Sequence, residues 1–264
     1  MADWLVVLIL GIVEGITEFL PVSSTGHLLI AEHLMRVHMS DLFNIVIQSG
    51  AVLAVIPLFH QRFHQFLFRW REKSTQDYLL KIAVACVITG GPGYVLEKKG
   101  FKLPEAVTPI AWALLIGGIG FVAVEAWLRG RVLKDAITWP IVVAVGVGQL
   151  VAAIFPGASR SGTTILFCLV LGLARPAATE FCFLVGIPTM LAAGGLKIFK
   201  SLHHAAPGMP SENWGMVFLG LIVSAVVSFL AVKWLLRYVQ THTFTAFGWY
   251  RIAAGIAVFL LMRV

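Results

Sequence analysis

Long apolar stretches recur along the chain, and short polar segments separate them. Six of these stretches are long enough to cross a hydrocarbon core of about 30 Å as helices. They do not alternate apolar and polar residues with a period of two, so they are not barrel strands, and lipid leaves an unpaired backbone no hydrogen-bond partner. The expected spans are Phe43–Phe59, Tyr78–Leu96, Glu105–Leu128, Ala177–Phe199, Trp214–Leu236 and Phe244–Met262.

Two further apolar segments are interrupted by Pro, Gly and hydroxyl residues. The first covers Trp4–Val37 with a break at 20–26, and the second covers Ile137–Leu173 with a break at 156–162. Neither contains one clean span. Interrupted helices in membranes usually dip in and return, because irregular backbone is tolerated only where it lines a cavity or is buried in protein. We therefore expect two re-entrant helix hairpins.

The two broken segments lie about 135 residues apart, and each is followed by three expected spans. Three crossings is an odd number, so the second copy would be inverted relative to the first. This predicts an all-α integral membrane protein with one membrane domain, 1–264, made of inverted repeats at about 1–130 and 131–264. The bundle would have about six transmembrane helices plus two re-entrant hairpins, about ten helices, with the hairpins meeting near the midplane.

Composition and charge support a membrane protein. The chain has 59% hydrophobic and 12% charged residues, whereas soluble domains carry about 25% charged residues, so membrane lipids are its expected surroundings. The net charge of +7 does not predict nucleic-acid binding, because the Lys and Arg residues cluster between spans, where they set topology. An oligomer is compatible with the sequence. Nine positive residues on the side of 60–77, 129–136, 174–176 and 237–243 against seven on the other favour a cytoplasmic location for these four segments.

Glu14 and Glu18 are four positions apart, so a helix would place both carboxylates on one face. Intramembrane acids cost several kcal/mol unless they face a cavity, a cation or a shared proton. Such a pair suits general acid or base catalysis, or binding of a divalent cation. The alternative is a buried pair that bonds hydroxyl groups of a neighbouring helix.

The first break places Ser23, Ser24, Thr25 and Gly26 before His27, at the expected start of a helix. Free N–H groups at a helix N-terminus, together with hydroxyl donors, make an anion site. The same residues are also an ordinary helix start. A hydroxyl nucleophile needs a base within hydrogen-bond reach, and His27 or Glu18 could serve.

The second break again sets hydroxyl residues and Gly at a helix start, now with Arg160 among them. Apolar chain lies on both sides of Arg160, so it is not a topology charge in a loop. The guanidinium matches phosphate oxygens well, and near the midplane it needs an anionic partner. A structural ion pair with Glu14 or Glu18 is the alternative, and it is compatible with catalysis.

Three other polar residues inside or near spans have simpler interpretations. Gln48 lies mid-span and either bonds to the site or joins helices. Glu125 lies near a span end, where we expect it to reach the interface. Glu180 follows the link into the fourth span, and we expect it to cap that helix.

At these residues the sequence resembles the undecaprenyl-diphosphate phosphatase family, the bacitracin-resistance membrane proteins. The resemblance rests on two motifs, Glu14-Gly15-Ile16-Thr17-Glu18-Phe19-Leu20-Pro21-Val22-Ser23-Ser24-Thr25-Gly26-His27 and Pro156-Gly157-Ala158-Ser159-Arg160-Ser161-Gly162-Thr163-Thr164. Both motifs are complete, and the apolar layout fits the family over nearly the whole chain.

The resemblance implies hydrolysis of undecaprenyl diphosphate to undecaprenyl phosphate and inorganic phosphate, with Mg²⁺ or Ca²⁺, at the outer face of the bacterial plasma membrane. The polyprenyl diphosphate lipid would be the substrate, and the reaction would recycle the carrier of cell-wall synthesis. The expected essential residues are Glu14, Glu18, His27 and Arg160, with the two acids as cation ligands. The expected phosphate pocket comprises Ser23, Ser24, Thr25, Gly26, Gln48, Gly157, Ser159, Ser161, Gly162 and Thr163.

The mechanism we expect docks the terminal phosphate between two helix N-termini, since phosphoryl transfer needs mainly positioning and charge neutralisation. Ser24 is the first candidate for the nucleophile, with Glu18 or His27 as its base, and attack by His27 or by water stays open. The rival function is a polyprenyl-phosphate flippase or transporter, because inverted repeats with broken helices are typical of transporters.

Overall fold

The computed structural model describes residues 2–99, 107–203 and 213–261, in which the regular secondary structure is helical apart from one isolated β-bridge between Lys134 and Leu173. The first half contains α1 (Asp3–Thr17), α2 (Ser24–Met35), α3 (Asp41–Val55), the 3-10 turn η1 (Ile56–Phe59), α4 (His60–Phe68), α5 (Lys73–Lys98) and α6 (Val107–Trp127). The second half contains α7 (Trp139–Ile154), α8 (Arg160–Val170), α9 (Arg175–His203), α10 (Trp214–Tyr238) and α11 (Thr245–Leu261). The prediction of an all-α membrane protein is confirmed.

Within residues 2–99, 107–203 and 213–261, five helical stretches are long and apolar enough to cross a membrane. They are α3 continued through η1 and α4, then α5, α6, α9 and α10. The sixth expected span corresponds to α11, of which 17 residues are described. Glu105 and Met262, the expected ends of two spans, lie outside the described residues. The segment after Phe59 is not only a link, because α4 extends the helix beyond it.

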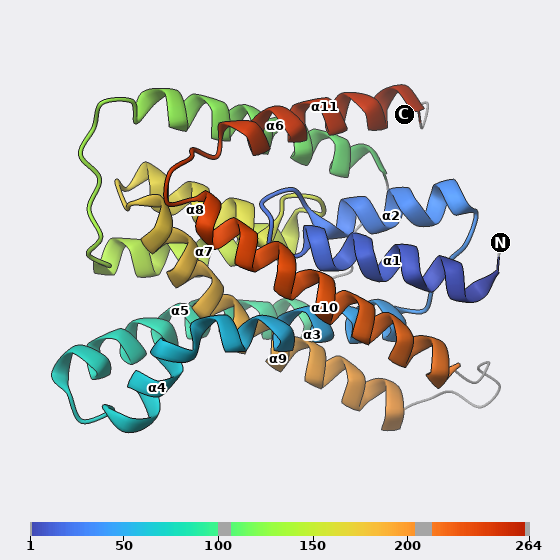
Figure 1. Cartoon of the computed structure of the whole chain (residues 1–264), viewed down its shortest axis with the longest axis horizontal. Helices are drawn as coiled ribbons and strands as arrows, with labels where there is room; N and C mark the ends of the chain where they lie inside the picture. Colours follow the sequence, from blue (N-terminus) through green and yellow to red (C-terminus); the bar gives the residue numbers. More distant parts are fainter. Residues whose placement is uncertain (1, 100–106, 204–212, 262–264) are drawn as a thin grey trace.

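The two broken segments each form a pair of short helices that contact each other, α1 with α2 and α7 with α8. The longest of the four has 16 residues, about 24 Å at 1.5 Å per residue, so none crosses the hydrocarbon core alone. Figure 1 shows the two hairpins opening toward opposite ends of the bundle, with their connecting loops in the middle. The hairpins therefore bring both loops to the interior.

The two halves of the chain pack into each other. The first-half helix α1 lies against the second-half helix α10, and α7 lies against α5. Helices α6 and α11 pack side by side, as do α3 and α9. This exchange of neighbours favours the inverted repeat, which stays a prediction. In Figure 1 the described ends of the chain, near residues 2 and 261, lie at one end of the bundle and α4 at the other.

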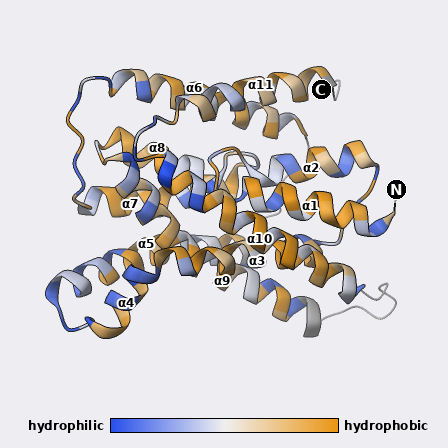
Figure 2. Cartoon of the chain, viewed as in Figure 1, coloured by the Kyte–Doolittle hydropathy of each residue, from blue (hydrophilic) through white to orange (hydrophobic). Residues whose placement is uncertain are grey.

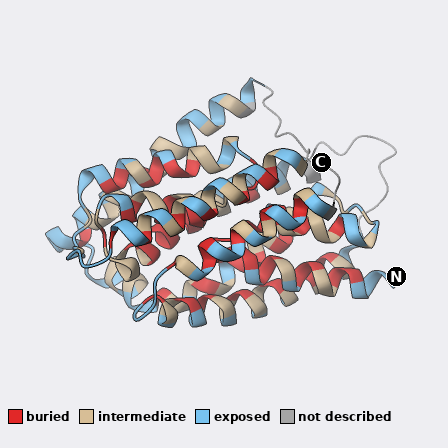
Figure 3. Ribbon diagram, turned by 90° about the horizontal axis from the view of Figure 1, so that it is seen from above, coloured by how far each residue is buried: buried red, intermediate tan, exposed pale blue. Residues whose placement is uncertain are grey.

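Hydrophobic residues cover much of the surface as well as the interior, as a bilayer environment requires. Figure 2 shows apolar residues along α1, α3 and α10, with hydrophilic residues gathered around α4. Figure 3 shows that buried residues recur along particular sides of the helices. The main core lies beneath the hairpin loops, where the rings of Phe19 and Phe183 meet edge to face at 4.9 Å.

Two sequence interpretations of acidic residues were wrong. Glu125 does not reach the interface: it is 2% exposed, pairs with Arg175, and accepts a hydrogen bond from the backbone N–H of Phe244 at 2.8 Å. Glu180 does not cap α9, which begins at Arg175. It binds Nε of Arg62 at 2.6 Å instead. Both acids pair with arginines that are distant in sequence, and the local spacing of residues does not predict such pairs.

Candidate active site between the two hairpin loops

Both hairpin loops end in a serine N-cap with the same unusual backbone conformation. Ser23 and Ser159 are the N-caps of α2 and α8, and both have positive φ, 77° and 67°. Each side-chain oxygen accepts a hydrogen bond from the glycine N–H three residues later, Gly26 at 3.3 Å and Gly162 at 3.1 Å. Positive φ is uncommon for residues with a side chain and is found mostly where the surrounding structure enforces it.

Small residues let the two loops approach α6 closely. A Cβ at Gly157, whose φ is +84°, would lie 2.8 Å from Cα of Ile110, and a Cβ at Gly26 would lie 3.0 Å from the Ile110 side chain. Ser161 is buried, and its hydroxyl donates to the backbone oxygen of Leu20 in the other loop at 3.1 Å. Glycines and a serine therefore join the loops to each other and to the same turn of α6.

Glu18 is the centre of the polar contacts. Its Oε2 accepts from the Ser24 hydroxyl at 2.6 Å and from Nε2 of Gln48 at 3.3 Å. Its Oε1 pairs with Nη2 of Arg160 at 3.2 Å, although the two residues are 142 positions apart. The structure thus places the first-hairpin acid, the candidate nucleophile and the second-hairpin cation in contact, and Gln48 bonds to this site.

Glu14 lies one helical turn before Glu18 and is 1% exposed. Neither of its carboxylate oxygens receives a hydrogen bond from a donor in the described part of the chain. Its carboxyl group lies beside that of Glu18, which pairs with Arg160, so it belongs to the same cluster. A buried carboxylate with unused oxygens is costly unless a ligand occupies them.

Arg160 is also incompletely satisfied. Its guanidinium lies over the ring of Phe19 at 5.3 Å and its side chain is 15% exposed. Nε and Nη1 have no hydrogen-bond partner among residues 2–99, 107–203 and 213–261. Nη1 packs against Gly186 of α9, where a Cβ would collide with it, so a residue with a side chain would not fit at this position. Two donors of the planar fork thus remain for an anion.

His27 does not bond to Ser24 in this structure. Its Nδ1 lies 2.7 Å from the backbone oxygen of Ser23, which can only accept, so Nδ1 carries a proton. Its Nε2 lies 2.6 Å from the hydroxyl of Tyr250, and the two rings stack. Of the two bases that the sequence leaves open for Ser24, the geometry therefore favours Glu18.

The remaining expected pocket residues lie in or beside the loops with differing exposure. Thr25 is exposed, whereas Ser161 is buried. The hydroxyl of Ser159 lies 3.2 Å from that of Ser161, and Thr163 donates to the backbone oxygen of Ala158 at 3.2 Å. These hydroxyls bond within the loops and can still accept or donate to a ligand.

Two residues beside the site were not found from the sequence, Tyr250 and Arg251 of α11. Tyr250 contacts His27, and the side chain of Arg251 reaches both loops. No short motif surrounds them. The available signal was a charged residue inside the expected span Phe244–Met262, since an intramembrane arginine is functional by default.

The donor set limits how a metal could bind. The part of the chain that the structure describes has no group of three or more His, Cys, Asp or Glu residues placed to hold an ion. Glu14 and Glu18 supply carboxylate oxygens only, which Mg²⁺ and Ca²⁺ prefer, and Mg²⁺ is commonly held by one or two carboxylates plus substrate phosphates. The residues therefore fit a cation shared with a phosphate ligand.

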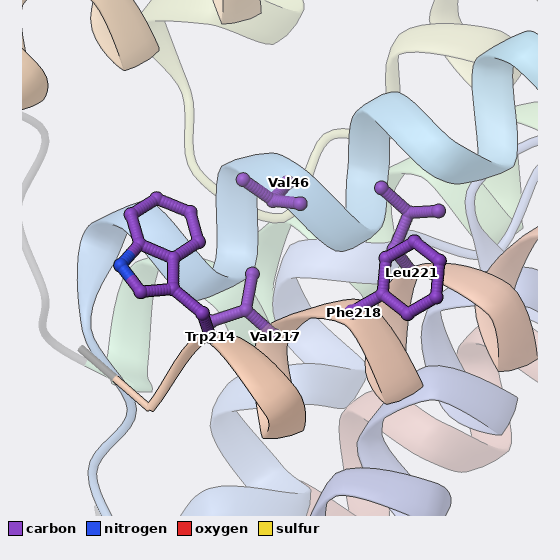
Figure 4. A pocket seen from close by; sticks show the side chains of 5 residues that line it. All are labelled: Val46, Trp214, Val217, Phe218 and Leu221. Atoms are coloured by element: carbon purple, nitrogen blue, oxygen red, sulfur yellow. The ribbon is translucent and has the colours of Figure 1, made fainter.

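An apolar groove lies between α3 and α10 (Figure 4). It is lined by Val46, Trp214, Val217, Phe218 and Leu221. Its lining is apolar apart from the indole N–H of Trp214 and holds none of the polar site residues. The chemistry therefore belongs to the polar cluster between the loops.

The chain is similar in sequence to a known protein family and to several of its members. The model of the family described as "Bacitracin resistance protein BacA" matches residues 7–257. A relative named undecaprenyl-diphosphatase from Rhizobium etli is 49% identical over 255 residues, which cover 96% of this chain and 95% of the relative. Another of that name from Xanthomonas axonopodis pv. citri is 44% identical over 261 residues, covering 98% and 97%. Similarity extends over nearly the whole length.

Proposed function

This chain belongs to the BacA bacitracin resistance family, and from this premise we propose that it hydrolyses undecaprenyl diphosphate to undecaprenyl phosphate and inorganic phosphate. The observation that carries the proposal is the contact of Ser24, Glu18 and Arg160 across the two hairpins. A hydroxyl, a base and a cation within hydrogen-bond reach are the groups that phosphoryl transfer requires.

In the proposed reaction, Ser24 Oγ attacks the terminal phosphorus while its proton passes to the carboxylate of Glu18, which already accepts its hydrogen bond. The bond from that phosphorus to the bridging oxygen breaks, and undecaprenyl phosphate leaves. Water then hydrolyses the phosphoserine, releasing inorganic phosphate and restoring the hydroxyl. The unused donors of Arg160 and the backbone N–H groups at the two helix starts hold the phosphate oxygens.

We also propose that Glu14 and Glu18 hold a divalent cation, Mg²⁺ or Ca²⁺, together with the substrate. The support is the pair of unused, buried oxygens of Glu14 beside Glu18. A cation there would neutralise charge on the diphosphate. The carboxylate of Glu14 is buried inside the bundle. Close packing of α1 on α10 excludes lipid there, because a Cβ at Gly15 would lie 2.7 Å from the backbone oxygen of Ser224.

The membrane setting of the reaction is part of the proposal. We place the protein in the bacterial plasma membrane with the site open to the outer face. The excess of positive residues near α4 supports this orientation, because it points that end of the bundle to the cytoplasm. We keep the inverted repeat as a proposal, supported by the matched pairs α1 with α10 and α7 with α5. The flippase alternative is not favoured, because the relatives are named as diphosphatases.

A phosphate-release assay on purified protein in detergent tests the function, since hydrolysis needs no sealed compartment whereas transport does. We expect the parent to release phosphate from undecaprenyl diphosphate, and Arg160→Ala and Glu18→Gln to lower kcat/KM by about 100- to 1,000-fold. A chelator should lower parental activity, and added Mg²⁺ or Ca²⁺ should restore it. Arg62→Ala, which removes an arginine paired with Glu180 on α9, is the matched control. A parent without phosphate release would contradict the proposal.

A further inference from the structure

Arg251 is a buried charge that the proposed reaction does not use. It lies in the first half of α11, is 1% exposed, and is the largest fully buried side chain in the described residues. Apolar and small residues follow it along the helix. An arginine in such a position is costly unless its donors are used.

The guanidinium of Arg251 joins the two hairpin loops. Nη1 donates to the backbone oxygen of Pro21 in the first loop at 3.2 Å, and Nη2 donates to that of Ala158 in the second loop at 3.1 Å. Nη2 also donates to the backbone oxygen of Ala113 on α6 at 2.9 Å. One rigid fork thus bridges the loop that carries Ser24 and the loop that carries Arg160.

Glycines make room for this side chain. A Cβ at Gly117 of α6 would collide with the guanidinium, and a Cβ at Gly162 of α8 would lie 2.8 Å from Nη1. Gly162 is also the residue whose N–H bonds the cap Ser159. The space that the guanidinium needs is therefore built into the same turns that form the site.

The charge of Arg251 has no counter-ion in the described part of the chain. Its hydrogen bonds go to backbone oxygens, no acid pairs with it, and its Nε has no partner there. It lies between the starts of α2 and α8, which carry the positive ends of their helix dipoles. Positive potential therefore accumulates at this point, and an anion between the loops would relieve it.

We propose that Arg251 is a positioning residue for the reaction: it holds the two hairpin loops in register, and its unpaired charge strengthens binding of the diphosphate between them. This inference rests on the proposed function. It assigns two separable roles to the Arg251 side chain. The planar guanidinium holds the two loops in register, and its positive charge strengthens diphosphate binding. Lysine at this position can keep the positive charge without the planar set of donors.

Kinetics of Arg251→Met and Arg251→Lys separate these roles. For Arg251→Met we expect kcat/KM for undecaprenyl diphosphate to fall about 100-fold, because misplacing groups by about 1 Å has that effect. Competitive inhibition by inorganic phosphate should weaken about 10-fold as one charge near the anion is lost. Arg251→Lys should keep phosphate inhibition within about threefold of the parent while kcat stays low, because an ammonium is a point charge without the planar fork.

The matched control is Arg175→Met, which removes a half-buried arginine that pairs with Glu125. We expect it to lower the melting temperature but to leave kcat and phosphate inhibition within about threefold of the parent. Arg251→Met with both constants within that range would overturn the proposal. So would Arg251→Lys losing phosphate inhibition as fully as Arg251→Met, since the charge would then have no role.

A distance measurement tests the register without turnover. Spin labels on cysteines at Thr25 and Thr163, after replacement of the three native cysteines, report the separation of the two loops by pulsed electron paramagnetic resonance. The distance distribution should broaden in Arg251→Met and stay narrow in Arg175→Met. Equal widths in both would overturn the proposal even if the parent released no phosphate, and that lack of release alone would contradict only the proposed function.

Discussion

The two hairpin loops share a backbone and differ in the residue that follows the cap. Ser23 and Ser159 both have positive φ and accept the same hydrogen bond from a glycine N–H. The next residue is Ser24 in the first loop and Arg160 in the second. The same cap conformation is thus followed by the candidate nucleophile in the first hairpin and by the anion-binding arginine in the second.

The helices that lead into the loops differ in how well their polar groups are satisfied. On α7, Gln149 donates to Thr89 at 3.0 Å and accepts from Thr189 at 2.9 Å, so its amide is used. On α1, Glu14 has two buried oxygens without donors in the described residues. Buried polar groups are normally bonded, so an unbonded one marks a functional position. By this criterion α1 carries a functional group and α7 a structural one, and in the second hairpin the functional group is Arg160 at the start of α8, whose Nε and Nη1 also have no partner in the described residues.

The strongest way to break this comparison is Ser24→Ala. We expect at least about a 1,000-fold loss of kcat, because the attacking oxygen is removed while the loops remain. Phosphate release over time measures the loss. Ser228→Ala is the control, since the hydroxyl of that buried serine of α10 donates to the backbone oxygen of Ala51. Activity near the parental value in Ser24→Ala would mean that water or His27 attacks.

Glu14→Gln tests the unused carboxylate. We expect kcat/KM to fall about 100-fold, and the cation concentration for half-maximal activity to rise, because a neutral amide is a weaker ligand for Mg²⁺ or Ca²⁺. A cation titration after chelation measures both. Glu32→Gln, a buried acid on α2 that bonds Asn44, should leave cation dependence unchanged. An unaltered titration in Glu14→Gln would contradict the cation site.

Tyr250→Phe sharpens the role of His27. Loss of the hydroxyl at 2.6 Å from Nε2 should lower kcat about 10-fold with little change in KM, because one oriented hydrogen bond is removed and the ring stays. Steady-state kinetics measure the two constants. Tyr94→Phe, at an exposed position on α5, is the control. A change in KM alone would place Tyr250 in substrate binding instead.

The smallest expected effects concern the caps, and here the two loops should behave alike. Ser23→Ala and Ser159→Ala should each lower stability by about 1 kcal/mol, because the cap hydrogen bond is lost. Glycine at either position should cost less, since it adopts positive φ without strain. Melting temperatures in detergent compare the four variants. Alanine and glycine with equal effects would show that φ is not under strain.

Sequence patterns predicted the elements because membrane helices are specified by apolar length and by Pro and Gly breaks. The break at 20–26 overlaps the start of α2, and that at 156–162 overlaps the start of α8. The polar cluster was also predictable, since Glu14, Glu18 and Arg160 are costly in lipid wherever they are not used. Local residue types were sufficient for these features.

Partners set by the packing of distant helices were not predictable. Nothing near Arg251 in the sequence indicates that its guanidinium would reach both Pro21 and Ala158. Likewise, Glu125 and Arg175 are 50 residues apart, and spacing gave no reason to pair them. The choice of Glu18 over His27 as the partner of Ser24 also depends on side-chain geometry. Both residues lie in the same motif, on either side of Ser24, and the sequence does not show which of them bonds to it.

The interlocking of α1 with α10 has a consequence for biogenesis. Arg160 is synthesised 142 residues after Glu18, roughly seven to thirty seconds later at ordinary ribosome speeds, and α10 follows still later. Until then the emerging first half carries two acids without their cation and a helix without its main neighbour. Membrane insertion of this protein must therefore shelter Glu14 and Glu18 from acyl chains until the second half arrives.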